Sequence, residues 1–464
     1  MMRALAAFLL ACTVLAAHAQ TARLEDLAQW IAVKGASAER IRVPVFGGNV
    51  VLYRAGKRGA EPVILIHGLS RSGARDWAQV IPALAESYDV FVVDLPGFGN
   101  SDKGNHLYSP ANYVRVLDAL FGERLKRPAT LVGHSMGGVI ALAYAAAYPE
   151  RVHRLIVADV AGVLHRSVYG EFLARAVTER AMGDSPWYDA LVKLIVTQAE
   201  DLPAKGLMGI EQPQVRQRLL RGDPYAIAAL ALVEHDLSRS LRAIKAPTLV
   251  VWTSDDRVAP PRAGEVLASV IPGARLLVIG EGGHAPQLSE PERFNAVLRD
   301  ELRGKIDLKP YAQPLALPAS ATKGRCTRER GRRFSGDYEE IVLEGCDDAE
   351  IRDARIGRLT VLSSQVRIVN SHVRDGVESR DSRLEFTGGS LGGEPPLALD
   401  ETSIDAAGLR FMPRGRVLAL NYGDEIVTLR LSVSEIAASS GEPRYTHQIM
   451  RLVADQSWTP RGAR

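Results

Sequence analysis

The sequence predicts an α/β fold built on a mostly parallel sheet with a helical insertion, followed by a C-terminal all-β domain. Up to about residue 305, short apolar runs rich in β-branched residues alternate with helical periodicities. This alternation is typical of a parallel sheet that helices cover on both faces. Beyond that point the helical periodicity stops, and short strand patterns recur at a nearly regular spacing.

The strands expected in the first part are short, apolar and bounded by turn residues. They span residues 62–66, 90–93, 129–132, 155–157, 248–251 and 276–279. Two earlier apolar segments, 42–46 and 50–53, flank a Gly-rich turn and predict a β-hairpin. Residues 163–243 lie between two of these strands but carry helical patterns and no convincing strand. We therefore expect a helical insertion within a domain that spans residues 20–305.

The first residues have the pattern of a secretory signal peptide. Arg3 precedes an apolar run that ends in a small-x-small cleavage site at 17–19. The run is shorter than the roughly 20 residues that a membrane-spanning helix needs. We expect residues 1–19 to be removed, which predicts a periplasmic or secreted protein without a stable membrane span. A membrane anchor and a lipidated Cys12 are the alternatives.

Composition restricts the classes of partner. The chain has 464 residues, of which 46% are hydrophobic and 24% charged, as in an ordinary globular protein with a core. A net charge of +3 spread over this length predicts no nucleic-acid partner. No group of His, Cys and Asp has the spacing of metal ligands, so we expect no metal and no cofactor.

The C-terminal region begins after a Pro/Ala-rich linker at 306–322 and spans 323–464. Four segments in it align at spacings of 17, 18 and 20 residues: 349–356, 366–373, 384–391 and 404–411. A period near 20 residues indicates a short parallel β-solenoid, with an antiparallel sandwich as the alternative. The solenoid predicts six apolar residues that point inward and stack from rung to rung: Ile351, Ile356, Ile368, Val373, Phe386 and Leu391. Residues 417–420 and 426–431 are expected to form a closing hairpin.

Two cysteines remain once the signal peptide is removed, Cys326 and Cys346. In an exported chain, a small and even number of cysteines predicts a disulfide between them. Two unpaired core residues are the alternative.

The chemistry of the first domain centres on Ser135. It lies in the pentad 133–137, GHSMG, directly after an expected strand and before an expected helix. Glycines on both sides avoid collisions in such a tight corner, which exposes the serine hydroxyl above the sheet. A plain tight turn is the alternative, but this context predicts a nucleophile.

A serine nucleophile needs a base and an acid that orients the base. His284 lies on a Gly-rich loop after the last expected strand, which suits the base. Asp255 and Asp256 follow the strand 248–251, and both fit the chain order Ser, acid, His. We prefer Asp256, with Asp255 and Asp159 as the other candidates.

An oxyanion hole requires backbone N–H groups near the nucleophile. One candidate donor is Met136, directly after Ser135 and at the start of a helix. The other is Leu69, because His67 and Gly68 follow the strand that ends at residue 66 and the glycine permits a close approach.

These motifs together resemble the α/β-hydrolase fold superfamily, in particular its esterase- and lipase-like serine hydrolases with a helical cap. The resemblance covers about residues 40–303. It is carried by His67-Gly68, the segment 94–101, the pentad 133–137, Asp256 and Gly283-His284. It implies that Asp256, four residues before Pro260, is the acid and that the insertion 163–243 is the cap. Thr253 departs from the pattern, because the family has a glycine there.

The sequence therefore predicts an exported serine hydrolase that cleaves small-molecule carboxylic esters or acyl substrates through an acyl-enzyme. The same triad would also serve a C–C hydrolase, lactonase, amidase, acyltransferase or perhydrolase, since fold and triad do not determine the substrate. An alternative of another class is a binding or scaffold protein that acts through its C-terminal domain, by contact with a cell wall or another polymer or by self-association.

Overall fold

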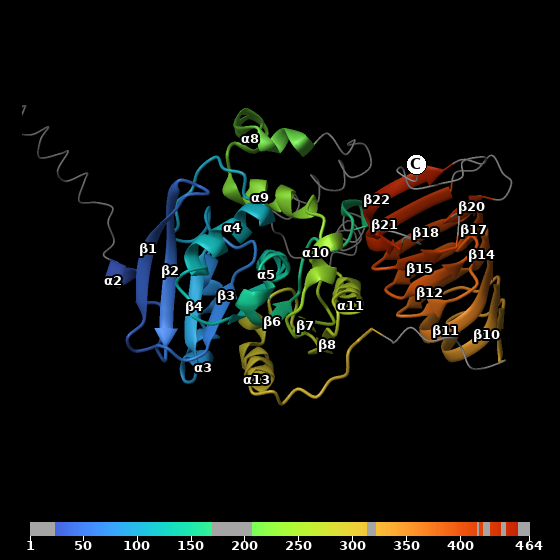
Figure 1. Ribbon diagram of the computed structural model, residues 1–464, viewed down its shortest axis with the longest axis horizontal. Helices are drawn as coiled ribbons and strands as arrows, with labels where there is room; N and C mark the ends of the chain where they lie inside the picture. The colour runs from blue at the N-terminus through green and yellow to red at the C-terminus, as the bar shows by residue number, and fades with distance from the viewer. Residues whose placement is uncertain are drawn as a thin grey trace, which may run out of the picture.

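The computed structural model describes residues 24–168, 207–312, 322–414, 417–420, 427–437 and 442–452. An α/β part and an all-β part lie side by side (Figure 1). The expected signal peptide at 1–19 falls outside the described residues, as does most of the expected linker. None of the helices within the described ranges is long and apolar enough to cross a membrane.

The α/β part is built on an eight-stranded sheet with the order β1-β2-β4-β3-β5-β6-β7-β8. Its strands are β1 (Ser37–Val43), β2 (Gly48–Gly56), β3 (Pro62–Ile66), β4 (Asp89–Asp94), β5 (Ala129–His134), β6 (Val152–Ala158), β7 (Thr248–Trp252) and β8 (Arg275–Val278). The pairs β1–β2 and β2–β4 are antiparallel, and the others are parallel. The mostly parallel sheet is thus confirmed. An N-terminal hairpin is present as well, but its first strand lies at 37–43 instead of 42–46, because the turn falls at 44–47.

Helices follow most of the strands. They are α2 (Leu24–Leu27), η1 (Gly73–Trp77), α3 (Ile81–Ala85), α4 (Pro110–Phe121), α5 (Met136–Ala147), η2 (Pro149–Arg151), η3 (Leu207–Glu211), α8 (Pro213–Leu220), α9 (Pro224–Val233), α10 (Ser238–Ala243), α11 (Pro261–Val270), α12 (Pro286–Ser289) and α13 (Pro291–Leu302). Between β6 and β7 the described residues hold helices and no strand, as the helical insertion predicts; residues 169–206 of that insertion are not described.

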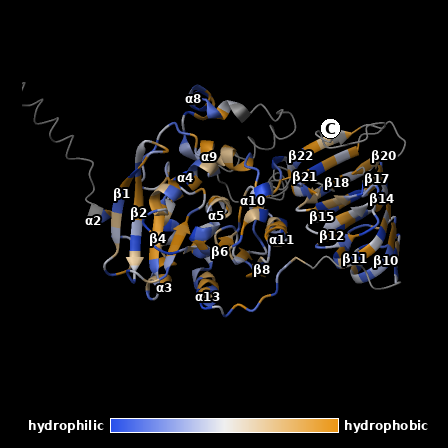
Figure 2. Cartoon of the chain, viewed as in Figure 1, coloured by the Kyte–Doolittle hydropathy of each residue, from blue (hydrophilic) through white to orange (hydrophobic). Residues whose placement is uncertain are grey.

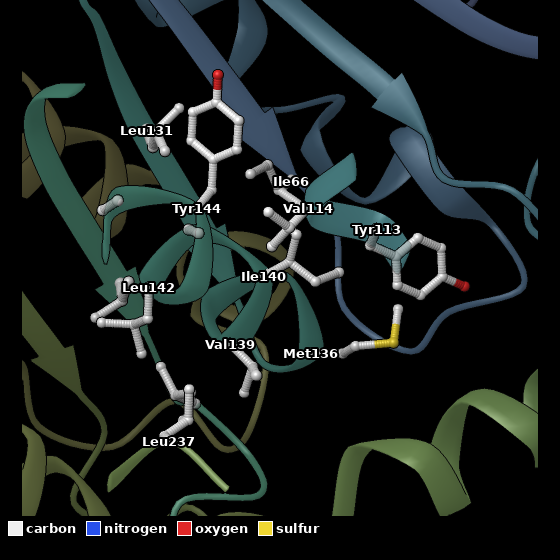
Figure 3. Packing of buried hydrophobic residues seen from close by; sticks show 14 of the residues in the cluster. Ile66, Tyr113, Val114, Leu131, Met136, Val139, Ile140, Leu142, Tyr144 and Leu237 are labelled. Atoms are coloured by element: carbon white, nitrogen blue, oxygen red, sulfur yellow. The ribbon is translucent and has the colours of Figure 1, made fainter. Parts of the chain in front are cut away.

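Two apolar layers enclose the sheet because successive strand residues point to opposite faces. On one face, Ile64 and Phe91 belong to the layer that includes α4, α5 and α11. On the other, Leu65 and Val92 belong to the layer with η1, α3 and α13. Figure 3 shows the first layer from close by, where Ile140 of α5 lies among side chains of β3 and α4. Helix α5 is buried along most of its length, which fixes the corner where it begins.

The C-terminal part consists of strands alone within its described residues. They are β9 (Lys323–Thr327), β10 (Arg333–Glu344), β11 (Ala349–Leu362), β12 (Gln365–Val369), β13 (His372–Val373), β14 (Val377–Arg380), β15 (Arg383–Thr387), β16 (Ser390–Gly393), β17 (Leu397–Asp400), β18 (Ser403–Ala407), β19 (Arg410–Pro413), β20 (Leu418–Leu420), β21 (Val427–Ile436) and β22 (Arg444–Leu452). Three parallel ladders connect them, β11-β12-β15-β18-β21, β11-β13-β16-β19-β21 and β11-β14-β17-β20.

The register of these ladders stacks the predicted inward residues. Ile351 pairs with Ile368, which in turn pairs with Phe386. The second series, Ile356, Val373 and Leu391, pairs in the same way. All six side chains are buried in one apolar cluster. Hydrophobic and hydrophilic residues alternate along these strands (Figure 2), and we interpret the stacked ladders as the short solenoid that the spacing predicts.

Two local expectations for this region have different outcomes. Cys326 and Cys346 form the predicted disulfide. The closing hairpin was placed wrongly: β20 pairs in parallel with β17, whereas β21 forms its antiparallel pair with β22. The reason is that β20 completes one rung while β21 begins the next, and a short apolar run has the same appearance in either arrangement.

The two parts of the chain share an interface. Arg262 of α11 forms two hydrogen bonds to the carboxylate of Asp405, at 3.0 and 3.1 Å. Arg242 of α10 pairs with Glu435 at 2.7 Å. Val433 of β21 belongs to the apolar layer of the α/β part, so the interface has an apolar centre as well as ion pairs.

Candidate active site

Ser135 occupies the corner between β5 and α5 in an unusual backbone conformation. Its φ and ψ are 52° and −120°, a region that residues other than glycine rarely adopt. The corner is tight because α5 starts against the end of β3. A Cβ atom on Gly137 would lie 2.2 Å from the carbonyl oxygen of Ile66, so only glycine fits there. Residues 133–137 thus form the sharp strand-to-helix turn that Gly133 and Gly137 predict.

His284 and Asp256 continue from Ser135 in a hydrogen-bonded series. His284 Nε2 lies 2.9 Å from Ser135 Oγ, and His284 Nδ1 lies 2.9 Å from Asp256 Oδ2. A carboxylate only accepts hydrogen bonds, so Nδ1 carries the ring proton and Nε2 accepts the serine proton. The second carboxylate oxygen of Asp256 accepts the N–H groups of Val258 and Ala259, at 2.7 and 2.9 Å. This geometry suits removal of the serine proton by the imidazole.

The neighbouring Asp255 faces the other way. Its Oδ1 accepts hydrogen bonds from the N–H groups of Gly282 and Gly283, at 2.8 and 2.9 Å. Burial would raise its pKa, but the backbone hydrogen bonds, those from Gly283 and Gly282 foremost, together with the charge of Arg257 hold the pKa below its usual value. Asp255 therefore shapes the loop that carries His284, while Asp256 contacts the imidazole itself.

Asp159, the third candidate for the acid, lies behind Asp256. Its side chain is buried and accepts the N–H of Thr253 at 3.0 Å. Burial first, and the negative charge of Asp256 second, raise the pKa of Asp159 well above its usual value. It contacts the triad through Asp256 and has no hydrogen bond to His284 among those of the described residues.

The predicted oxyanion donors, Leu69 and Met136, directly follow Gly68 and Ser135 in the chain. Gly68 is so close that a Cβ on it would be 3.0 Å from Ser135 Cβ. His67 holds the Gly68 carbonyl with Nδ1–H at 2.7 Å. The N–H of Leu69 points the opposite way, because a trans peptide directs its C=O and N–H to opposite sides. Met136 is the first residue of α5, where N–H groups lack a partner within the helix. The role of both donors stays a prediction.

Two functional neighbours were not identified from the sequence. His134 donates from Nε2 to the backbone oxygen of His284 at 2.5 Å, which holds the backbone of the base. Burial, followed by the nearby His284, lowers the pKa of His134 to about 3, so it stays neutral. Thr253 donates its hydroxyl to Gly283 O at 2.6 Å. Two features of the sequence could have indicated them: His134 is an ionisable residue next to the nucleophile, and Thr253 replaces a glycine of the family pattern.

Within the described ranges, no three His, Cys, Asp or Glu side chains gather as the ligands of a metal ion would.

Comparison with known proteins gives relatives that match somewhat more than half of this chain. Pimeloyl-[acyl-carrier protein] methyl ester esterase of Neisseria meningitidis is 32% identical over 274 residues, 58% of this chain and 85% of that protein. The 2-hydroxy-6-oxononadienedioate/2-hydroxy-6-oxononatrienedioate hydrolase of Paraburkholderia phymatum is 33% identical over 267 residues, 54% of this chain and 90% of that protein. A solved esterase from Thermogutta terrifontis is 28% identical, with a TM-score of 0.44, and the match covers 58% of this chain and 99% of that one.

The model of the alpha/beta hydrolase family matches residues 63–297, from β3 into α13. This segment contains the Ser135 corner, the acid loop and the loop of His284. By its sequence match, and in agreement with its sheet order and strained serine corner, the chain belongs to the alpha/beta hydrolase family.

Proposed function

We propose that this protein is an exported serine hydrolase that cleaves carboxylic esters through an acyl-enzyme. The observation that supports the proposal most strongly is the continuous hydrogen-bonded series from Ser135 Oγ through His284 to Asp256, which starts at a strained corner. The methyl ester esterase among the relatives supports an ester as the substrate.

The geometry supports the following reaction. Ser135 Oγ attacks the ester carbonyl while His284 Nε2 takes its proton, and Asp256 stabilises the resulting imidazolium. The N–H groups of Leu69 and Met136 donate to the oxyanion. His284 then gives the proton to the leaving alcohol, and the acyl group stays on Ser135. A water molecule, deprotonated by His284, cleaves the acyl-enzyme and restores the serine.

A fluorophosphonate probe tests the nucleophile, because only an activated serine reacts with it. We expect wild-type protein to be labelled and to cleave p-nitrophenyl esters, and Ser135→Ala to lose both properties with an almost unchanged Tm. Ser87→Ala, at an exposed loop position, is the matched control and should react as wild type. Labelling that persists in Ser135→Ala would contradict the assignment.

A second candidate is hydrolysis of a carbon–carbon bond by the same residues. It is favoured by the relative that acts on 2-hydroxy-6-oxononadienedioate. Assays of a 2-hydroxy-6-oxo-dienoate and of esters with varied acyl chains, on the same enzyme preparation, separate the two. A higher kcat/KM for the dienoate would replace the ester proposal.

Export is supported by the charged start, the apolar run and the small-x-small site of the first residues. N-terminal sequencing of protein recovered from the periplasm or the medium should begin at Gln20. A retained Met1 or a lipidated Cys12 would contradict the proposal.

A further inference from the structure

A second carboxyl group lies directly behind the triad. Asp159 follows β6, has a φ of 44° and is completely buried. The carboxyl of Asp256 lies near enough to raise the pKa of Asp159 by its negative charge, after burial, which is the larger cause. The reaction derived above does not use this residue, yet a buried acid next to the orienting acid affects the charge on which the imidazolium depends.

The two oxygens of Asp159 have different surroundings. Oδ1 faces the N–H of Thr253 at 3.0 Å and its hydroxyl at 3.4 Å. Oδ2 is buried and has no donor among the described residues. In an ionised Asp159, Oδ2 would be a desolvated anion beside a second negative charge, which is strongly unfavourable. A proton on Oδ2 removes the buried negative charge and turns this oxygen into a hydrogen-bond donor, which a neighbouring carboxylate accepts.

Thr253 connects this carboxyl to the loop of the base. A hydroxyl has one proton to donate, and the 2.6 Å contact with Gly283 O takes it in preference to the 3.4 Å contact with Asp159. The backbone N–H of the same residue binds Asp159. Thr253 therefore holds Asp159 with its backbone and the residue before His284 with its side chain.

We propose that Asp159 is a positioning residue of the triad: as a neutral carboxylic acid it donates a hydrogen bond to Asp256 and, together with Thr253, sets the acid loop relative to His284. The inference rests on the proposed function, because it takes Asp256 and His284 as the acid and base of ester hydrolysis. Burial of Asp159 and the charge of Asp256, which raise the pKa of Asp159, agree with a bound proton at neutral pH.

Thermal unfolding of the full chain tests the proton without any activity assay. A carboxyl with a raised pKa in the folded state contributes stability below its ordinary pKa, and this contribution is lost as the pH rises toward the folded-state pKa. Asp159→Asn cannot titrate and escapes this loss. We expect the Tm of Asp159→Asn, measured relative to wild type between about pH 4 and about pH 9, to increase with pH. A difference that is constant or decreases with pH would overturn the neutral state.

Kinetics at pH 7 test the positioning. Asp159→Asn keeps one accepting and one donating group, so its kcat should stay within about threefold of wild type, whereas Asp159→Ala should lose about 10- to 100-fold. KM should change little, because the defect affects the triad and not substrate binding. Equal losses in the two variants would overturn the proposal.

Thr253 supplies a second pair of variants that keeps the test valid if Asp159→Ala does not fold. Thr253→Val removes the hydroxyl at nearly constant volume and should lower kcat about tenfold, and Thr253→Ser should restore it. Failure of the serine variant to restore kcat would contradict the assigned contact.

Fluorophosphonate labelling separates the two proposals. An unlabelled wild type contradicts the proposed function. A labelled wild type with a fully active Asp159→Ala contradicts only the positioning role.

Discussion

At the scale of single residues, the backbone of Ser135 shows how the site is held. A residue in such a sparsely populated conformation costs of the order of 1 to 3 kcal/mol, and the surrounding structure must compensate for it. Ser135 N–H donates to Ala158 O at 3.0 Å, and Ser135 O accepts the N–H groups of Gly138 and Val139. The corner is therefore clamped from β6 and from α5, which keeps the hydroxyl in place before substrate binds.

The adjacent aspartates give a prediction at this scale. Asp256→Asn should lower kcat by roughly 10⁴-fold, because a neutral amide does not stabilise the imidazolium and its NH₂ group favours the wrong tautomer of His284. Asp255→Asn keeps an accepting oxygen for the N–H groups of Gly282 and Gly283, so we expect a change of less than about threefold. Steady-state kinetics with a p-nitrophenyl ester measure both, and a larger loss in Asp255→Asn would reverse the assignment of the acid.

At the scale of elements, the packing of each part of the chain determines which strand positions must be apolar. In the α/β part, alternate residues of a parallel strand point to two different helix layers, so the strands are apolar throughout. In the C-terminal part, residues one rung apart stack on each other, so the same inward position must be apolar in every rung. A polar residue at one such position disrupts the contacts of two neighbours.

Ile368 provides the test of the stacking. It lies between Ile351 and Phe386 and is 1% exposed, so Ile368→Asn buries an unpaired amide and should cost roughly 3 to 5 kcal/mol of unfolding free energy. Ile368→Val should cost about 1 kcal/mol. Urea denaturation measures both, with Gln365→Asn on the exposed face of the same strand as a control. An Ile368→Asn variant as stable as wild type would rule out the inward position.

At the scale of the whole molecule, the C-terminal part is packed against the hydrolase part. Arg262 is the second residue of α11 and follows Asp256 by six residues. Its side chain is 12% exposed and contacts Asp405. Its pKa is raised by Asp405 and by Glu385, in spite of the burial, which would lower it. The interface thus begins close to the acid loop, and we expect a chain truncated after Lys305 to be less soluble and less active than the full chain.

The Arg262–Asp405 pair allows a sharper measurement on the full chain. Asp405→Leu should destabilise the protein by roughly 3 to 5 kcal/mol, because the buried guanidinium loses the carboxylate that accepts two of its hydrogen bonds, whereas Arg262→Leu combined with Asp405→Leu should recover much of that loss. Glu344→Leu, which breaks the exposed pair with Arg325, should change stability by less than about 1 kcal/mol. Denaturant titrations that give equal effects for Asp405→Leu and Glu344→Leu would show that the interface does not contribute to folding.

The sequence by itself determined the features that depend on neighbours along the chain. The parallel strands, the serine corner, the order of Ser135, Asp256 and His284, and the stacking of Ile351 with Ile368 all follow from local periodicity and spacing. The tertiary structure decided what long-range contact alone can establish: that Asp255 faces the glycine loop, that Asp159 lies against Asp256, and that α11 binds the C-terminal part. A hydropathy pattern reports which face of an element is buried, but it does not report which distant element buries it.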